Sequence, residues 1–176
     1  MKTNLVLIGY RGTGKTVVGS VLAAEMGWPL VSLDQAIVER AGATIPDLVE
    51  SYGWRHFRAL EHEEVLRATR LERHIIDCGG GVVEDPRNVA ELRAHGFCVL
   101  LTATVPTIAA RIGGDVNRPS LTGKTIVEEI EEKLAQRGPL YASAADLTLA
   151  TDAAPPKEIA RQILAALRAG LGAGGA

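Results

Sequence analysis

A glycine-rich stretch near the start of the chain has the spacing of a phosphate-binding loop. Residues 9–16 read Gly-Tyr-Arg-Gly-Thr-Gly-Lys-Thr, which matches G-x-x-x-x-G-K-[ST]. The glycines permit a tight turn whose backbone N–H groups point at phosphate oxygens, and the following helix adds the positive end of its dipole. Lys15 can then reach the β- and γ-phosphates of a nucleotide, and the Thr16 hydroxyl can coordinate Mg²⁺. The predicted nucleotide-binding residues of this loop are Gly12, Thr13, Gly14, Lys15, Thr16 and Val17.

A second glycine run follows an apolar segment in the middle of the chain. Asp77 and Cys78 precede Gly79, Gly80 and Gly81. The pattern D-x-x-G after a strand resembles the γ-phosphate sensor of GTPases, but the guanine-reading sequence N-K-x-D is absent. Three consecutive glycines indicate a backbone that a second ligand approaches closely, and a simple turn is the alternative.

Five short apolar segments predict the strands that position these loops. They are rich in Val, Ile and Leu without polar alternation, which is typical of parallel strands covered by helices on both faces. The predicted strands are residues 4–8, 30–33, 74–78, 97–102 and 146–150. Helical patterns fill the intervals, so the chain predicts a three-layer α/β fold with right-handed crossovers.

One helix has a clear start and an expected end. Thr125 and Glu128 form a capping box that begins it. We expect this helix to run to Gln136, because Gly138 and Pro139 should stop it.

Two segments interrupt the alternation of strands and helices. Residues 34–73 form an excursion long enough for two or three helices, and residues 113–124 are polar and aperiodic, which predicts a mobile lid. Residues 171–176 are Gly and Ala and predict a flexible tail, which leaves residues 1–170 as a single domain.

The composition of the chain argues against several classes of partner and of protein. The 176 residues carry 19 basic and 21 acidic side chains, a net charge of −2 without long runs of one sign, which argues against nucleic-acid and membrane-surface partners. No segment approaches the ~20 apolar residues of a membrane span. Cys78 and Cys98 are too few for a disulfide framework and lie in apolar surroundings, so we expect them in the core. The sequence thus predicts a soluble, cytoplasmic protein, which we expect to be a monomer.

The motifs taken together resemble those of the shikimate kinase family. The resemblance runs from about residue 4 to residue 165, and it rests on the phosphate loop, Asp34, Phe57-Arg58-Ala59-Leu60-Glu61, Gly79-Gly80-Gly81, Arg118-Pro119 and Arg137-Gly138-Pro139-Leu140-Tyr141. It implies a P-loop kinase fold like that of nucleoside monophosphate kinases, with a five-stranded parallel sheet. It also implies transfer of the ATP γ-phosphate to the 3-hydroxyl of shikimate, giving shikimate 3-phosphate and ADP in chorismate and aromatic amino-acid biosynthesis, with Mg²⁺ as the cofactor.

The resemblance assigns substrate-binding roles. Arg58 and Arg137 correspond to the arginines that bind the shikimate carboxylate, which suits their planar guanidinium groups. Asp34 corresponds to the carboxylate that binds the ring hydroxyls, and Glu61 lies one helical turn from Arg58, where it can hold that guanidinium. Helix-surface ion pairs are the alternative for the two arginines. The predicted substrate-binding residues are Asp34, Phe57, Arg58, Glu61, Gly79, Gly80, Gly81 and Arg137.

The resemblance also assigns residues to phosphoryl transfer and to the base. Arg118 corresponds to the lid arginine that reaches the transferring group, and it completes a catalytic set with Lys15 and Asp34. A solvated surface charge is the alternative for Arg118. Arg111 resembles the arginine that packs on adenine, and Pro156 lies in the adenine loop.

One position departs from the family pattern. Shikimate kinases usually carry D-x-D after the second strand, and its first Asp helps to bind Mg²⁺ through water. Here Ser32 stands at that position and only Asp34 remains. Asp77, at the end of the neighbouring strand, is our hypothetical replacement, and a structural Asp that caps the glycine turn is the alternative. Two other functions stay open: a kinase for another hydroxylated carboxylic acid, and a nucleotide-binding module with low turnover.

Overall fold

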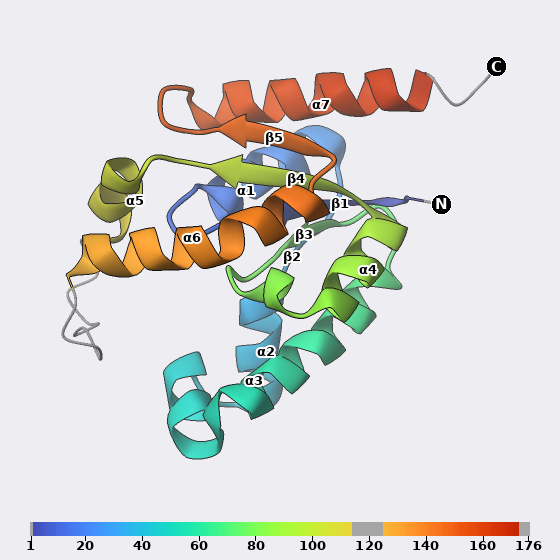
Figure 1. Ribbon diagram of the computed structural model, residues 1–176. Coiled ribbons are helices and arrows are strands. Elements are labelled where there is room, and N and C mark those ends of the chain that lie inside the picture. Colours follow the sequence, from blue (N-terminus) through green and yellow to red (C-terminus); the bar gives the residue numbers. More distant parts are fainter. Residues whose placement is uncertain (1, 114–124, 173–176) are drawn as a thin grey trace.

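Five parallel strands form one central sheet in the computed structural model, which describes residues 2–113 and 125–172 (Figure 1). The strands are β1 (Asn4–Ile8), β2 (Leu30–Ser32), β3 (Ile75–Asp77), β4 (Gly96–Thr102) and β5 (Leu147–Ala150). Their order across the sheet is β2-β3-β1-β4-β5, and each neighbouring pair is parallel. The predicted five-stranded parallel sheet is confirmed.

Helices alternate with the strands and cover both faces of the sheet. They are α1 (Lys15–Met26), α2 (Leu33–Ala41), α3 (Ile45–Thr69), α4 (Pro86–His95), α5 (Val105–Ile112), α6 (Ile126–Ala144) and α7 (Pro156–Gly172), with one 3₁₀ turn, η1 (Val82–Glu84). Part of the predicted lid, residues 114–124, lies outside the described residues, as do residues 173–176 of the predicted tail.

The predicted excursion consists of α2 and α3, which lie below the sheet in Figure 1. Gly53 interrupts α3 with non-helical backbone angles, φ 79° and ψ 167°. The segment thus has three helical pieces, as its length suggested.

The core divides into two layers because neighbouring strand residues point to opposite faces of the sheet. Val6 and Ile8 pack with α3, α4 and α6 in one cluster, whereas Leu5 and Leu7 pack with α1 and α7 in the other. All four side chains are almost fully buried. This arrangement explains why the strands carry apolar residues without alternation.

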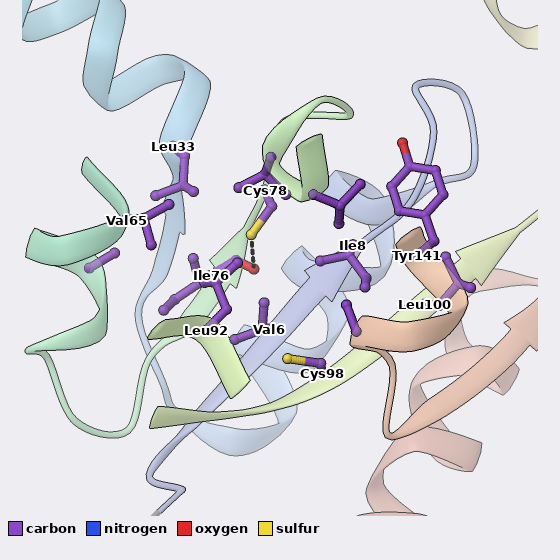
Figure 2. Close-up of a cluster of buried hydrophobic side chains, with 14 residues drawn as sticks. Val6, Ile8, Leu33, Val65, Ile76, Cys78, Leu92, Cys98, Leu100 and Tyr141 are labelled. Carbon is purple, nitrogen blue, oxygen red and sulfur yellow. Dashed lines mark hydrogen bonds between the residues drawn. The ribbon is translucent and has the colours of Figure 1, made fainter. Parts of the chain in front are cut away.

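Both cysteines belong to the first of these clusters, which Figure 2 shows in close-up. Cys78 and Cys98 are buried and unbonded to each other. The prediction that they are core residues is confirmed.

The predicted end of the helix after Thr125 is wrong. The capping box of Thr125 and Glu128 is present, but α6 passes through Pro139 and ends at Ala144. A proline inside a helix removes one backbone hydrogen bond. Buried packing of Tyr141 and Ala144 against the sheet offsets that loss, because both side chains are almost fully covered.

Candidate active site

The phosphate-binding loop connects β1 to α1, as the motif predicted. Gly9 has a φ of 140°, and an added Cβ would lie 2.3 Å from the Leu101 carbonyl oxygen, so only glycine fits there. The helix α1 starts at Lys15, directly after Gly14, and no described side chain caps that end. Its first N–H groups are therefore available to an anion.

Lys15 lies inside this loop and is 8% exposed. Its ammonium donates hydrogen bonds to the carbonyl oxygens of Gly9 at 2.9 Å and Tyr10 at 3.1 Å. Burial lowers the pKa of Lys15, and the charges of Asp77 and Asp34 oppose that effect. The loop thus holds a positive charge at the position where phosphates would lie.

A cavity of about 340 Å³ opens at the carboxyl ends of β1, β2 and β3. Its size falls within the usual range for a small-molecule site. It is lined by Arg11, Gly12, Gly14, Lys15, Thr16, Val17, Ser32, Asp34, Asp77, Cys78, Gly79 and Gly80. The phosphate loop, Asp34 and the glycine turn therefore share one cavity, at the sheet edge where open α/β sheets bind ligands.

Asp77 lies beside the phosphate loop at the end of β3. The Thr16 hydroxyl donates a hydrogen bond to Asp77 Oδ2 at 2.6 Å. Burial raises the pKa of Asp77, while the Thr16 hydrogen bond and the Lys15 charge oppose the shift. Ser32 is the register partner of Asp77 across the β2–β3 pair, and its side chain caps α2 by accepting from the Gln35 N–H.

Asp34 stands in the first turn of α2 and faces the glycine turn. An added Cβ on Gly79 would lie 2.5 Å from Asp34 Oδ1, so the glycine lets this carboxylate approach the backbone. Burial raises the pKa of Asp34, and the charge of Lys15 opposes that shift. Asp34 is thus a partly desolvated carboxylate that lies between Lys15 and the glycine turn.

Arg58 lies against the other end of the same turn. An added Cβ on Gly81 would lie 2.1 Å from Arg58 Nη2, so the guanidinium occupies the space that a side chain at position 81 would need. Arg58 Nη1 donates to Glu61 Oε2 at 2.7 Å, and Glu61 is 1% exposed. Burial raises the pKa of Glu61, and Arg58 opposes the shift. The predicted pairing of these two residues within α3 is confirmed.

Arg137 reaches the same place from α6. Its Nε donates to Glu84 Oε1 at 2.7 Å, and Glu84 Oε2 accepts from Arg58 Nη2 at 3.0 Å. The Tyr141 hydroxyl donates to the Gly80 carbonyl oxygen, and burial raises the pKa of Tyr141 to about 12. The sequence reasoning missed Glu84, because it belongs to no motif and meets both arginines only through the fold.

Phe57 and Trp54 flank Arg58 on α3. Phe57 is buried with Ile37 and Leu48, and its ring lies edge-on to Trp54, which is 57% exposed. The Arg58 guanidinium lies 5.4 Å from the Phe57 ring and 5.5 Å from the Trp54 ring. Phe57 thus supports the arginine, and its role as a wall of the substrate site stays a prediction.

Arg111 links two loops near the nucleotide side. Its guanidinium donates to the Gly12 carbonyl oxygen at 3.1 Å and to Oγ1 and the carbonyl oxygen of Thr151 at 3.0 and 2.8 Å. Thr151 Oγ1 in turn donates to the Thr13 carbonyl oxygen at 2.9 Å. This network ties the phosphate loop to the loop that precedes Pro156. Arg118, the predicted lid arginine, lies outside the described residues.

Comparison with known protein families identifies a match over most of the chain. The family model for shikimate kinase matches residues 11–168. Shikimate kinase of Xanthomonas axonopodis pv. citri is 39% identical over 166 residues, which cover 94% of this chain and 92% of that relative. Shikimate kinase of Nitratidesulfovibrio vulgaris is 40% identical over 150 residues, which cover 84% of this chain and 86% of that relative.

Solved structures give the same match. Shikimate kinase from Acinetobacter baumannii in complex with shikimate has a TM-score of 0.90 and 30% identity, and the alignment covers 97% of this chain and 95% of that one. Shikimate kinase from Aquifex aeolicus has a TM-score of 0.83 and 27% identity, with 96% and 98% of the two chains covered.

Proposed function

The chain belongs to the shikimate kinase family, ATP-dependent phosphotransferases that act on shikimate, and we propose that different residues around this cavity bind ATP, bind shikimate and promote the phosphoryl transfer. One observation carries the proposal. The turn Gly79–Gly81 contacts Asp34 at one end and Arg58 at the other, closer than any side chain would allow. A small acid that lies on this turn can therefore meet a proton acceptor and an arginine together.

The phosphate loop would bind the triphosphate of ATP. Backbone N–H groups at the start of α1 surround the phosphates, and Lys15 neutralises the charge that develops on the transferring group. The base is proposed to lie against Val17, Arg111 and Pro156. Val17 is exposed at the cavity wall, and Arg111 joins the phosphate loop to the loop that precedes Pro156. Arg118 is proposed to contribute a second positive charge to the transferring phosphoryl group.

The arginines would hold the carboxylate of shikimate, and Asp34 its hydroxyls. Arg58 and Arg137 converge on one carboxylate, that of Glu84, which supports their capacity to bind another. Glu61 orients the Arg58 guanidinium through their ion pair within α3. Asp34 would accept a hydrogen bond from the attacking 3-hydroxyl and hold its proton as the phosphoryl group moves away from ADP. Transfer is in line and needs no covalent enzyme intermediate.

Thr16 and Asp77 would hold Mg²⁺ on the nucleotide. Their hydroxyl and carboxylate oxygens are hard donors that lie 2.6 Å apart beside the loop, and Mg²⁺ commonly takes one or two such ligands together with phosphate oxygens. Among the described residues no three His, Cys, Asp or Glu side chains cluster as a metal cage, so the proposal takes the remaining ligands from the nucleotide and water. The ion supplies neutralisation of phosphate charge when bound.

No described helix has the length and apolar character needed to cross a membrane. We extend the proposal to a monomeric enzyme that works in the cytoplasm on ATP and shikimate. Gel filtration with light scattering tests the monomer.

The substrate assignment is tested by ADP release coupled to a spectroscopic readout. Shikimate, quinate and gluconate are supplied in turn with Mg-ATP, beside a control without acceptor. We expect turnover with shikimate, and Arg58→Ala and Arg137→Ala should each raise its KM. Turnover with another acid and none with shikimate would contradict the proposal, as would an unchanged KM in both variants.

The metal assignment is tested by exchanging the two register partners. Asp77→Asn should raise the Mg²⁺ concentration needed for half-maximal activity and weaken Mn²⁺ binding to the nucleotide complex, measured by electron paramagnetic resonance. Adding Ser32→Asp to Asp77→Ser should restore both readouts, because the carboxylate then returns on the neighbouring strand. An Asp77→Asn variant with the Mn²⁺ affinity of the parent would remove Asp77 from the metal site.

A further inference from the structure

We propose that Glu84 is a displaceable internal ligand of the substrate arginines, which competes with the carboxylate of the incoming acid. The inference rests on the proposed function, because it takes Arg58 and Arg137 as the residues that bind that carboxylate. It adds a residue that lowers substrate affinity and decides which anions reach the site.

Glu84 binds both arginines with one carboxylate. Its Oε2 accepts from Arg58 Nη2 at 3.0 Å and its Oε1 accepts from Arg137 Nε at 2.7 Å. The arginines come from α3 and α6, and Glu84 ends the 3₁₀ turn that follows Gly81. One carboxylate bridging two guanidinium groups is the arrangement expected of a bound carboxylic acid. Glu84 therefore occupies donors that the substrate needs.

The two glutamates of the cluster differ in their freedom to leave. The side chain of Glu61 is 1% exposed and is held within α3, one turn from Arg58, so its departure would leave a buried charge unpaired. The side chain of Glu84 is 34% exposed and lies on a three-residue turn. Rotation of its side chain into solvent leaves the carboxylate hydrated. Glu84 is thus the exchangeable partner and Glu61 the permanent one.

The charges of the cluster favour replacement of the Glu84 carboxylate by the substrate carboxylate over binding of both together. Two guanidinium groups are paired with two carboxylates, so these four charges cancel; Lys133, which acts on Glu84, and Asp34, which acts on Glu61, add one charge of each sign. A substrate carboxylate added beside Glu84 would leave one negative charge in excess, at distances where like charges repel. Withdrawal of Glu84 restores neutrality and frees Arg58 Nη2 and Arg137 Nε together.

Glu84 is ionised under ordinary conditions. Partial burial raises its pKa, but the hydrogen bond and charge of Arg137, together with the charge of Arg58, lower the pKa overall. The competition is therefore between two carboxylates of equal charge, and the outcome depends on the remaining contacts. A hydroxylated ring acid adds bonds at Asp34 and the glycine turn, which inorganic anions and simple carboxylates cannot make. Glu84 thereby protects the arginines from common anions.

The test replaces the charge of Glu84 without changing its size. Glu84→Gln should lower the KM for shikimate roughly 3- to 10-fold, the effect of removing two partly exposed ion pairs, while kcat changes less than twofold. Calorimetric binding of shikimate without nucleotide should tighten by a similar factor. Sulfate should become a stronger inhibitor competitive with shikimate in this variant. Thermal melting verifies that the variant is folded, and Glu84→Ala serves as a second variant.

Glu63→Gln is the matched control. Glu63 also pairs with an arginine, Arg40 of α2, but neither residue lines the cavity or pairs with Arg58 or Arg137, so the variant carries the same change in net charge without touching the substrate arginines. It should leave the KM for shikimate and sulfate inhibition unchanged. A KM that stays the same or rises in both Glu84 variants would overturn the inference and make Glu84 an orienting residue. If Arg58→Ala and Arg137→Ala leave the KM unchanged, the proposed function fails instead.

Discussion

Replacing Gly81 by alanine should selectively damage substrate binding. The φ of Gly81 is −94°, which any residue adopts, so the variant changes only a contact. The new Cβ would lie 2.1, 2.5 and 2.6 Å from Nη2, Nη1 and Cζ of Arg58. The guanidinium must therefore retreat by about 1.3 Å to reach an ordinary contact distance near 3.4 Å.

This movement disturbs the hydrogen bonds of the Arg58 guanidinium. Its bond to Glu61 at 2.7 Å, which orients the guanidinium, would lengthen or realign, and the donors would no longer point at the turn. Hydrogen bonds that involve charged groups contribute about 1.5–3 kcal/mol. Because Arg58 is displaced and not removed, the lower value applies, and it corresponds to about a tenfold higher KM for shikimate.

Steady-state kinetics with varied shikimate, together with calorimetric binding of ATP, check this prediction. The KM for shikimate should rise about tenfold, whereas the affinity for ATP should stay the same because the phosphate loop is untouched. Gly138→Ala is the control: it lies beside Arg137, and an added Cβ meets nothing within 4 Å. A shikimate KM within twofold of the parent in Gly81→Ala, or an equal loss of ATP affinity, would refute the steric argument.

Three further predictions concern other parts of the site. Burial raises the pKa of Asp34, so kcat/KM should fall on acidification at a higher pH than for an ordinary aspartate. The ionised form of this buried carboxylate destabilises the fold at pH values above its raised pKa. Asp34→Asn should therefore raise the melting temperature while abolishing turnover. Tyr141→Phe loses the bond to the Gly80 carbonyl, worth about 1 kcal/mol, and should lower the melting temperature by about 2–4 °C in a thermal scan. Thr151→Val loses the bond to the Thr13 carbonyl and should weaken ATP binding about tenfold by calorimetry without affecting shikimate.

The fold was largely predictable because its signals are local. Each strand is a short apolar run, and the caps of α4 and α6 stand in the sequence as Asp85 and Thr125. The end of α6 was not predictable from Gly138 and Pro139. Their local cost is outweighed by burial of Tyr141, two residues after Pro139, and local sequence reasoning does not detect burial against a distant strand.

The residues of the candidate site also divide into those that local sequence signals predict and those that only the fold brings together. Lys15 and Thr16 are fixed by a contiguous motif, and Arg58 and Glu61 by helical spacing, so both pairs were predictable. Glu84 lies 26 residues from Arg58 and 53 from Arg137, and its role arises from the packing of η1 between α3 and α6. No spacing rule covers such distances along the chain.

On the proposal that Asp77 takes the place of the carboxylate missing at Ser32, a departure from the family pattern preserves the metal site. The two residues are register partners on adjacent parallel strands, whose separation is about 4.8 Å. Moving the carboxylate from β2 to β3 therefore shifts it sideways by one strand while keeping it at the carboxyl edge of the sheet. The shift brings it to 2.6 Å from the Thr16 hydroxyl, and it frees the serine to cap α2, the helix that carries Asp34. On that proposal, the missing motif residue is weak evidence for lost activity, because its register partner supplies the same chemistry.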